Sequence, residues 1–452
     1  MKKDYQTSAR RVRTGRTTPK KARVSSEQLA HEAAVSLPAT VTVAIAELKG
    51  DMEEGLLALV VGAGLKVIDV LFEEEVTALA GPKGRHDPNR SAVRHGADDG
   101  LVTLGARAFE IRRPRLRSAD GSTEVPLATY EWAKDTELLE RETMARMLAK
   151  LSTRRYGVGL EPMGSAVEAK SRSTSKSAVS RRFVAATESA LAELMSADLS
   201  GLDLVAIMVD GANFGDHLCV CALGIGIDGT KHPLALVEGD TENATVCKRL
   251  LVDLRTRGLD VTRPTLFVID GSTAFPPAVK AVFDHPVIAR CEEHKVRNVA
   301  RHLPKDVARI VERRMRAAYR NPDPLVGQGD LEALATELER SHPGAAGSLR
   351  EGLAETFTIS RLGVPPTLAR TLRSTNCIES MIEICKDHAR NVKRWRDGDM
   401  ALRWCAAGML EAKRQFRRVN GHLHLKALRA ALDKHVAGDT PSNYDGGKEV
   451  AA

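Results

Sequence analysis

The sequence has no long apolar run and no dense set of cysteines. Its 452 residues contain no stretch of the roughly 18 to 20 apolar residues that spans a bilayer, and their basic, polar beginning is unlike a signal peptide. Seven cysteines are scattered along the chain, whereas small secreted domains concentrate them, so we expect reduced thiols. These absences exclude a helical membrane protein and a disulfide-stabilised secreted domain, and we expect a cytoplasmic protein.

The excess of positive charge is confined to the beginning of the chain. The net charge is +8, and residues 1–24, with nine Lys or Arg and one Asp, account for all of it. This arm has almost no apolar content, so we expect it to be disordered unless it meets a polyanion such as DNA. The remaining residues are balanced, but 290–320 and 380–418 are locally basic. Either segment is equally well interpreted as solvated helix faces.

The composition indicates a folded protein with several cores. Hydrophobic residues make up 43% of the chain and charged residues 28%, close to the average of soluble globular proteins. The length exceeds the size at which a single core stops growing, so we expect two to four folding units.

The first half of the chain is predicted to be mainly helical. Helical spacing of apolar residues over 26–79 predicts two or three packed helices, with a break or a close crossing at Gly62 and Gly64. Residues 81–126 begin with a basic stretch that is rich in Gly and Pro. Apolar residues then partly alternate along the chain, which predicts short strands before Pro114.

Two helices before residue 200 suggest a helix-turn-helix. The first is predicted over 135–151, and the second follows an N-cap at Ser173, Thr174 or Ser175. The second helix opens with the polar and basic residues of a DNA-reading helix, namely Lys176, Ser177, Ser180, Arg181 and Arg182. A capped amphipathic helix with a basic beginning is an equally ordinary structural element.

The pattern changes to β-strands at Leu202. Three apolar runs closed by turn signals, LDLVAIMVDG, HLCVCALGIGIDG and HPLALVEGD, predict an antiparallel meander. An amphipathic helix, the strand TLFVIDG, a helix over 275–283 and a strand over 286–289 follow. The order βββαβαβ predicts a mixed five-stranded sheet with helices on its faces.

Helices are predicted for most of the remaining chain. They run from Glu292 to about Ser374 with interruptions at 321–324 and 365–366, and a long helix then contains STNCIESMIEICKDHARNVKRW. The residues from Gly438 onward have the composition of a disordered tail.

Two aspartates stand where apolar strands end. Asp210 follows LVAIMV and Asp270 follows TLFVI, and each is followed by glycine. Either one alone is more simply a turn residue. If the two strands are neighbours, the carboxylates emerge together at one edge of the sheet and repel each other. A divalent cation that prefers oxygen ligands, Mg²⁺ or Mn²⁺, removes this conflict.

These residues resemble a known family. The segments MVDGANFGDHLCVCALGIGIDGTKHPLALVEGDTENA, FVIDG, the Cys291-x-x-His294 element and STNCIES occur in the order found in bacterial insertion-sequence transposases of the Mutator-like superfamily. The resemblance is good over about 200–415 and looser over 30–135, where it depends on a basic segment ending in IRRPRLR.

The resemblance implies a fold and a set of site residues. It implies a ribonuclease-H-like α/β catalytic domain with an all-α insertion, preceded by a mainly helical DNA-binding region. Its Asp-Asp-Glu triad falls on Asp210, Asp270 and Glu379, with Glu238 and Glu383 as competitors for the third position. The DNA-binding residues that we predict are Arg112, Arg113, Arg115, Lys176, Arg181 and Arg182.

The corresponding division of the chain has six parts. They are a basic arm (1–24), a helical and small β DNA-binding region (25–135), a helical segment with the helix-turn-helix (136–199), the catalytic domain (200–291 and 372–418), the all-helical insertion (292–371) and a C-terminal tail (419–452).

The implied reaction is DNA transposition with two bound Mg²⁺ or Mn²⁺ ions. Water attacks at a transposon end, and the freed 3′-hydroxyl then attacks target DNA. We expect double-stranded DNA, as terminal inverted repeats and target, a homodimer or higher homo-oligomer, and association with the bacterial nucleoid. The alternatives are a catalytically inactive, transposase-derived DNA-binding protein and a ribonuclease-H-like nuclease that cuts without joining.

Four cysteine and histidine positions remain. Cys291 and His294 are spaced like half of a zinc site, but no second pair has convincing spacing, so we predict a structural or near-site role. Cys219 and Cys221 share one face of a predicted strand and are interpreted as core residues.

Overall fold

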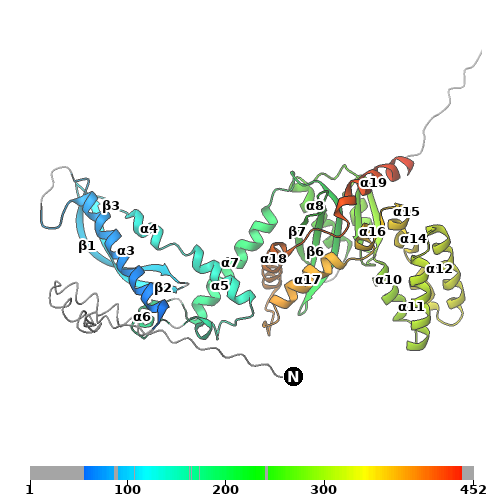
Figure 1. Ribbon diagram of the computed structural model, residues 1–452, viewed down its shortest axis with the longest axis horizontal. Coiled ribbons are helices and arrows are strands. Elements are labelled where there is room, and N and C mark those ends of the chain that lie inside the picture. Colours follow the sequence, from blue (N-terminus) through cyan, green and yellow to red (C-terminus); the bar gives the residue numbers. More distant parts are fainter. Residues whose placement is uncertain are drawn as a thin grey trace, which may run out of the picture. The chain divides into compact units, whose positions relative to one another are not determined.

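The structure is a computed structural model that describes residues 55–85, 90–105, 107–161, 163, 165–172, 174–239 and 243–439. The chain forms two compact units, shown in Figure 1. The first contains residues 1–98, 112–130 and 161–170, and the second contains 99–111, 131–160 and 171–452. The predicted basic arm, the segment 26–54 and the end of the chain lie outside the described residues. No helix within the described part has the length and apolarity needed to cross a membrane.

The first unit is built on one long helix. Helix α3 runs without interruption over Leu56–Ala80, so the break predicted at Gly62 and Gly64 is wrong. Each glycine costs a helix about 1 kcal/mol relative to alanine, but apolar residues continue at helical spacing on both sides. The buried face consists of Ala58, Val61, Ile68, Phe72, Val76 and Ala80. Tertiary packing of this face therefore outweighs the weak local propensity.

Strands and a short helix complete the first unit. Strand β2 (Arg107–Ser118) pairs with β3 (Glu124–Val125), and α4 (Ala128–Ala133) follows. The Glu75 carboxylate accepts hydrogen bonds from the N–H groups of Ala128 (2.7 Å) and Thr129 (3.0 Å), which ties α3 to the beginning of α4. We predicted that the strands stop before Pro114, but β2 continues through this residue. Proline removes one N–H donor but is compatible with an extended backbone. The other elements are β1 (Ala92–Leu104) and α6 (Ser165–Ala169). Elements β1, β2 and α4 each include residues of both units, and β4 (Ser171–Arg172), which pairs with β2, is counted in the second.

The second unit is organised around a mixed five-stranded sheet, which confirms the predicted element order. Its strands are β5 (Leu204–Phe214), β6 (His217–Gly226), β7 (Lys231–Gly239), β8 (Thr265–Ile269) and β9 (Pro286–Arg290). The strand order is β7-β6-β5-β8-β9. The three consecutive strands pair antiparallel, whereas β8 and β9, each reached through a helix, are parallel to their neighbours.

Alternating side chains of the sheet pack against two groups of helices. Ile207 and Val209 point to the face covered by α8 and α9, and Met208 points to the face covered by α7, α17 and α18. Cys219 and Cys221 are fully buried, as predicted for core residues. The bounds are α7 (Lys176–Ser196), α8 (Ala244–Thr256), α9 (Phe275–Lys280), α17 (Asn376–His388) and α18 (Gly398–Gln415).

An all-helical insertion follows β9 and has its own core. Its helices are α10 (Glu292–Ala300), α11 (Lys305–Tyr319), α12 (Pro324–Glu339), α13 (Pro343–Arg350), α14 (Leu353–Thr356), α15 (Thr358–Arg361) and α16 (Pro366–Leu372). The predicted interruptions are confirmed, since α12 and α16 begin at prolines. The insertion begins and ends at one place, because Glu292 N–H donates to the Arg373 carbonyl at 3.0 Å.

Three elements differ from their predictions. Helix α17 ends at His388 and does not continue to Trp395. Residues 425–439, which we assigned to the tail, form α19, and Leu425, Leu428 and Leu432 of this helix are buried in the core beside the sheet. Helices α5 (Glu137–Leu148) and α7 pack together, but residues 149–175 connect them through further short elements. A helix-turn-helix has a turn of three or four residues, so the structure differs from that interpretation.

Candidate active site

Asp210 and Asp270 lie on neighbouring strands. In the parallel pair β5–β8, Val209 is opposite Ile269, so the next residue of each chain emerges at the same sheet edge, where strands are about 4.8 Å apart. Continuing the alternation from Met208 directs Asp210 to the face that α17 covers, and the same holds for Asp270. The strands thus bring the two predicted carboxylates together.

Helix α17 brings a third carboxylate to this edge. Glu379 lies in its first turn, and α17 packs against β5. Glu379 Oε1 is 3.3 Å from His294 Nε2 and 3.2 Å from Arg297 Nη2, both on α10. The Nδ1 atom of the same histidine is 3.2 Å from Thr375 Oγ1, at the N-cap of α17. The beginnings of α10 and α17 are therefore held together by polar contacts around Glu379.

The electrostatic environment of Asp210 reflects this gathering of acids. Burial raises the pKa of Asp210 to about 6, with a further contribution from the nearby carboxylate of Asp270 and a smaller one from Glu379. A hydrogen bond from Gly211 N–H (2.8 Å) and the proximity of His294 oppose the rise. A largely buried carboxylate flanked by two other acids is costly to ionise, and a cation would relieve that cost.

Backbone groups hold the second aspartate in place. Asp270 Oδ1 accepts hydrogen bonds from Gly271 N–H at 2.6 Å and Ser272 N–H at 3.0 Å. The carbonyl of Gly271 in turn accepts a hydrogen bond from Arg290 Nη1 at 3.2 Å. The loop that carries Asp270 is therefore held by hydrogen bonds on both sides of Gly271.

The donor types at this edge fit a hard divalent cation. Asp210, Asp270 and Glu379 offer only carboxylate oxygens, the ligands that Mg²⁺ and Mn²⁺ prefer. In the residues that the structure describes, no three Asp, Glu, His or Cys side chains form a ready metal-binding group. Glu379 is instead held by His294 and Arg297.

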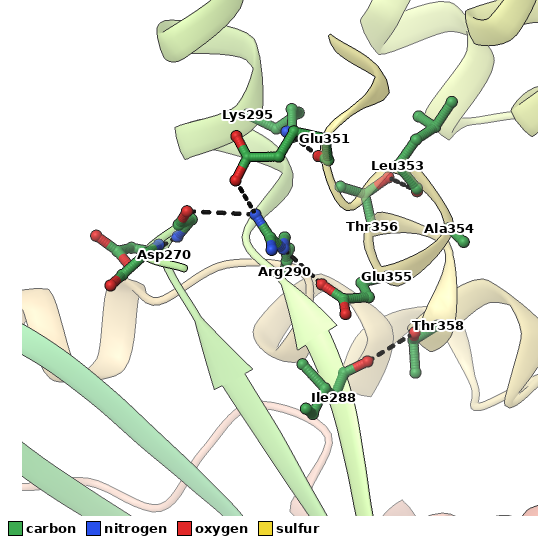
Figure 2. A network of polar contacts seen from close by, with 12 residues as sticks. Asp270, Ile288, Arg290, Lys295, Glu351, Leu353, Ala354, Glu355, Thr356 and Thr358 are labelled. Carbon is green, nitrogen blue, oxygen red and sulfur yellow. Dashed lines mark hydrogen bonds and ion pairs between the residues drawn. The ribbon is translucent and has the colours of Figure 1, made fainter. Parts of the chain in front are cut away.

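Arg290 was not predicted and connects the site to the insertion. This buried arginine ends β9, and its guanidinium forms ion pairs with Glu355 (Nε–Oε2, 2.5 Å) and Glu351 (Nη1–Oε1, 3.3 Å), as Figure 2 shows. Gly352 has a left-handed φ of +59°, and a Cβ there would lie 2.3 Å from Arg290 Nε. Only glycine allows this approach. A sequence signal existed, since Arg290 directly follows a short apolar strand.

Lys295, on α10 close to Arg290, connects two parts of the insertion. Its ammonium is buried and donates hydrogen bonds to the carbonyls of Ser348 (2.7 Å) and Glu351 (Figure 2). Burial, together with the neighbouring Arg290, lowers the pKa of Lys295 to about 8. Arg290 thus attaches the insertion to the sheet, and Lys295 holds α10 against the later part of the insertion that carries Glu351.

The two competitors for the third acidic position lie elsewhere. Glu238 is the penultimate residue of β7 and pairs with His217 Nδ1 at 2.9 Å. Its carboxyl group lies against Gly398 at the beginning of α18. Glu383 is exposed on α17, one turn beyond Glu379. Neither residue contributes to the electrostatics of Asp210.

Cys291 and His294 are close in sequence but occupy different surroundings. Cys291 is buried at the N-cap of α10, and burial raises the pKa of its thiol. The imidazole of His294 bridges Thr375 and Glu379. The pair does not converge on a shared point with further cysteine or histidine side chains in the described part of the chain.

The predicted DNA-binding arginines of β2 have acidic neighbours. Arg115 forms a bidentate ion pair with Glu124 (3.1 and 2.8 Å), and Arg113 lies 3.8 Å from Asp98 and over the Tyr130 ring at 4.9 Å. Arg112 Nη2 donates to the carbonyl of Ala97 at 3.5 Å. The three side chains are thus partly engaged by other residues of the chain.

The predicted DNA-binding residues of α7 lie around its beginning. Ser175 is the N-cap, its Oγ accepting from Ala178 N–H at 3.3 Å, as one of the three predicted alternatives. Lys176 and Arg181 are exposed, whereas Arg182 is half-buried, and burial lowers the pKa of its guanidinium.

Comparison with known proteins defines the class. A family model described as "Transposase, Mutator family" matches residues 41–419, and the chain belongs to this family. This confirms the resemblance seen in the sequence motifs.

Individual relatives are insertion-sequence transposases. The transposase for insertion sequence element ISRM5 of Rhizobium meliloti (strain 1021) is 25% identical over 363 residues, which cover 80% of this chain and 89% of that protein. The transposase for insertion sequence element IS6120 of Mycolicibacterium smegmatis is 31% identical over 189 residues, 40% of this chain and 57% of the relative. A probable transposase of Corynebacterium diphtheriae is 28% identical over 221 residues, 48% and 63% of the two chains.

Proposed function

We propose that this member of the Mutator family is a DNA transposase with an Asp-Asp-Glu active site. It cleaves DNA at the ends of an insertion sequence and joins the freed 3′-hydroxyl to target DNA. The observation that carries the proposal is that Asp210 and Asp270 lie side by side on neighbouring strands, and that Glu379 on α17 is near enough to add to the cost of ionising Asp210. The strand order β7-β6-β5-β8-β9 and the helices on both faces fit a ribonuclease-H-like catalytic domain.

The chain's own residues would prepare the reaction. Asp210, Asp270 and Glu379 would hold Mg²⁺ or Mn²⁺, two ions in our proposal, which activate the attacking oxygen and stabilise the leaving oxygen of an in-line displacement. The N–H groups after each aspartate orient its carboxylate. His294 and Arg297 orient Glu379, and half-exposed Arg297 also offers positive charge to a phosphodiester.

Recognition of DNA ends is assigned to the residues before the catalytic domain. The exposed Lys176 and Arg181 at the beginning of α7 support this assignment, together with the positive charge of residues 1–24. An insertion sequence has two ends, and the described part of each chain has one set of the acids Asp210, Asp270 and Glu379, here called the acidic cluster. We therefore propose a homodimer or higher homo-oligomer as the active form.

The test is a plasmid assay with isosteric variants. Supercoiled plasmid carrying both element ends is incubated with Mg²⁺ or Mn²⁺ and wild type, Asp210→Asn, Asp270→Asn or Glu379→Gln. Wild type should yield nicked, excised and joined products. Each variant should lose roughly a thousandfold or more in rate, about 4 kcal/mol in the barrier, because loss of one ligand disturbs both ions.

The control variant and the alternative functions give distinct results. Glu383→Gln, an exposed acid on the same helix as Glu379, should leave all products unchanged. Wild type that binds DNA but never cuts would show a DNA-binding protein without catalysis, and cutting without joining would show a nuclease. Loss of activity in Glu383→Gln but not in Glu379→Gln would place the third ligand one helical turn later.

A further inference from the structure

A polar cavity lies at the junction of α10, α11, α16 and α17, beside the acidic cluster. Its volume is about 560 Å³. Helices α10 and α17 both begin at it and then continue to His294, Arg297 and Glu379. Asn376 in its wall is within one helical turn of Glu379, about 5 Å along the axis. The cavity is therefore adjacent to the site but is not part of it.

Four arginines line the cavity, and two of them have acidic partners. Arg316 forms a bidentate ion pair with Glu293 (2.5 and 2.8 Å), and Arg373 Nε lies 3.4 Å from Glu292 Oε1. The other two are Arg320 and Arg370. They are exposed, and neither has an ion-pair or side-chain hydrogen-bond partner among the residues described. The cavity consequently keeps an excess of positive charge.

The acids in the wall do not cancel this excess. Glu293 is already paired, and burial raises the pKa of Glu292 to about 8 despite Arg373. Glu292 Oε1 and Arg373 Nε are buried without a hydrogen bond, so both have unused hydrogen-bonding capacity. The first N–H groups of two helices add partial positive charge at the same place. An anion would find donors here on several sides.

A line of arginines leads along α11 to the cavity. Arg309, Arg313, Arg316 and Arg320 recur at intervals of four, three and four residues, which places them on one face of the helix. The first two of these are exposed and unpaired within the described part of the chain. This face accounts for much of the local charge excess that the sequence shows over 290–320.

We propose that this cavity and the arginine face of α11 bind consecutive phosphates of the DNA strand that enters the acidic cluster. The inference rests on the proposed function, and it names a contact surface for the substrate that the reacting acids do not provide. Planar guanidinium groups suit bidentate phosphate contacts, and a row of them follows a strand without reading its sequence. The insertion would then hold the substrate strand in addition to separating the second aspartate from the glutamate.

The experiment measures binding of full-length protein in EDTA, where no cutting occurs. Fluorescein-labelled duplex and single-stranded DNA of mixed sequence are titrated with wild type, the double variant Arg320→Gln/Arg370→Gln and the control Arg340→Gln. Arg340 is an exposed, unpaired arginine at the end of α12, away from the cavity lining. Thermal unfolding should be the same for all three proteins, because each substitution is on the surface.

The expected result is weaker binding with a smaller dependence on salt. Removal of two guanidinium groups that bind phosphates should reduce affinity roughly a hundredfold. The slope of log affinity against log salt should become less steep by about 2, near 0.9 for each phosphate that is no longer neutralised. The control should match wild type. Affinity and slope equal to the control in Arg320→Gln/Arg370→Gln would overturn the proposal.

Two further measurements distinguish the proposal from a site for free phosphate and from the proposed function. Inorganic phosphate alone should stabilise wild type against heat more than chloride does at equal ionic strength, and should stabilise Arg320→Gln/Arg370→Gln less. The same selective stabilisation without any loss of DNA affinity in the double variant would show a site for free phosphate only and overturn the proposal. Plasmid cutting by wild type in Mg²⁺ tests the proposed function separately. If wild type fails to cut but the double variant binds DNA more weakly, the phosphate contacts stand and the proposed function fails.

Discussion

Two adjacent regions differ in how their buried charges are compensated. They are the acidic cluster and the attachment of the insertion around Arg290 and Lys295. At the sheet edge, Asp210 and Asp270 bring like charges together, and burial holds the pKa of Asp210 near 6. A few residues away, Arg290 has acidic partners and Lys295 has carbonyl partners. The buried cations of the attachment have carboxylate or carbonyl partners, whereas burial and the neighbouring acids raise the pKa of Asp210 in the cluster. We infer that the attachment serves stability and the acidic cluster serves chemistry.

Breaking the attachment should have the larger effect on folding. Arg290→Met removes the guanidinium from two carboxylates and from the Gly271 carbonyl, and should lower the free energy of unfolding by about 3 kcal/mol. Urea denaturation measures the change. Adding Glu355→Met should recover part of the loss, because one of the two carboxylates that lack their partner is then removed. Equal stability of Arg290→Met and wild type would show that the attachment is not structural.

Removing one charge from the acidic cluster should raise the free energy of unfolding instead of lowering it. The pKa of Asp210 in the folded protein is about 6, above its ordinary 3.8, so without metal the folded protein loses stability as pH rises between these values. Asp210→Asn should therefore be more stable than wild type above pH 6 in EDTA, by about 2 kcal/mol, and equal near pH 4. Thermal unfolding across this range checks the difference. A destabilised variant at pH 7 would contradict the interpretation.

The substitution of Lys295 should have the smallest effect on stability, and this effect should be seen at alkaline pH. Its pKa of about 8 in the folded protein is below the ordinary 10.5, so stability should rise as pH increases from about 8 to 10.5. The two carbonyl acceptors offset part of the burial, and we expect a rise of about 1 kcal/mol. Lys295→Met should remove the rise, which denaturation at several pH values would detect. An identical pH profile in both proteins would assign it to other groups.

The sequence predicts the sheet and two of the three acids because their signals are local. Apolar runs indicate strands, and parallel pairing follows from the helix between two strands. The predicted strand end is confirmed for Asp270, which directly follows β8, but is wrong for Asp210, because β5 continues to Phe214 in its pairing with β6. Glu379 is chosen mostly through the family resemblance, because a possible cap at Thr375 or Asn376 and apolar neighbours are weak local signals for a catalytic acid. Its surroundings depend on α10, more than 80 positions earlier.

The parts that sequence patterns missed depend on long-range packing. Arg290 and Lys295 look like surface cations until Glu351 and Glu355 fold back onto them from the far end of the insertion. Helix α3 continues through its glycines, and α19 forms inside the predicted tail. In both helices, burial of an apolar face decides the outcome, and local propensity describes that poorly.

The hydrogen bond between Glu292 N–H and the Arg373 carbonyl holds the two ends of the insertion together. The polypeptide leaves the sheet and returns to it at nearly the same point. Residues can therefore be added to or removed from the insertion without changing where α17 begins. Such an architecture lets the insertion change in length while the three acids stay in register, and it marks the tips of the insertion helices as places for engineered fusions.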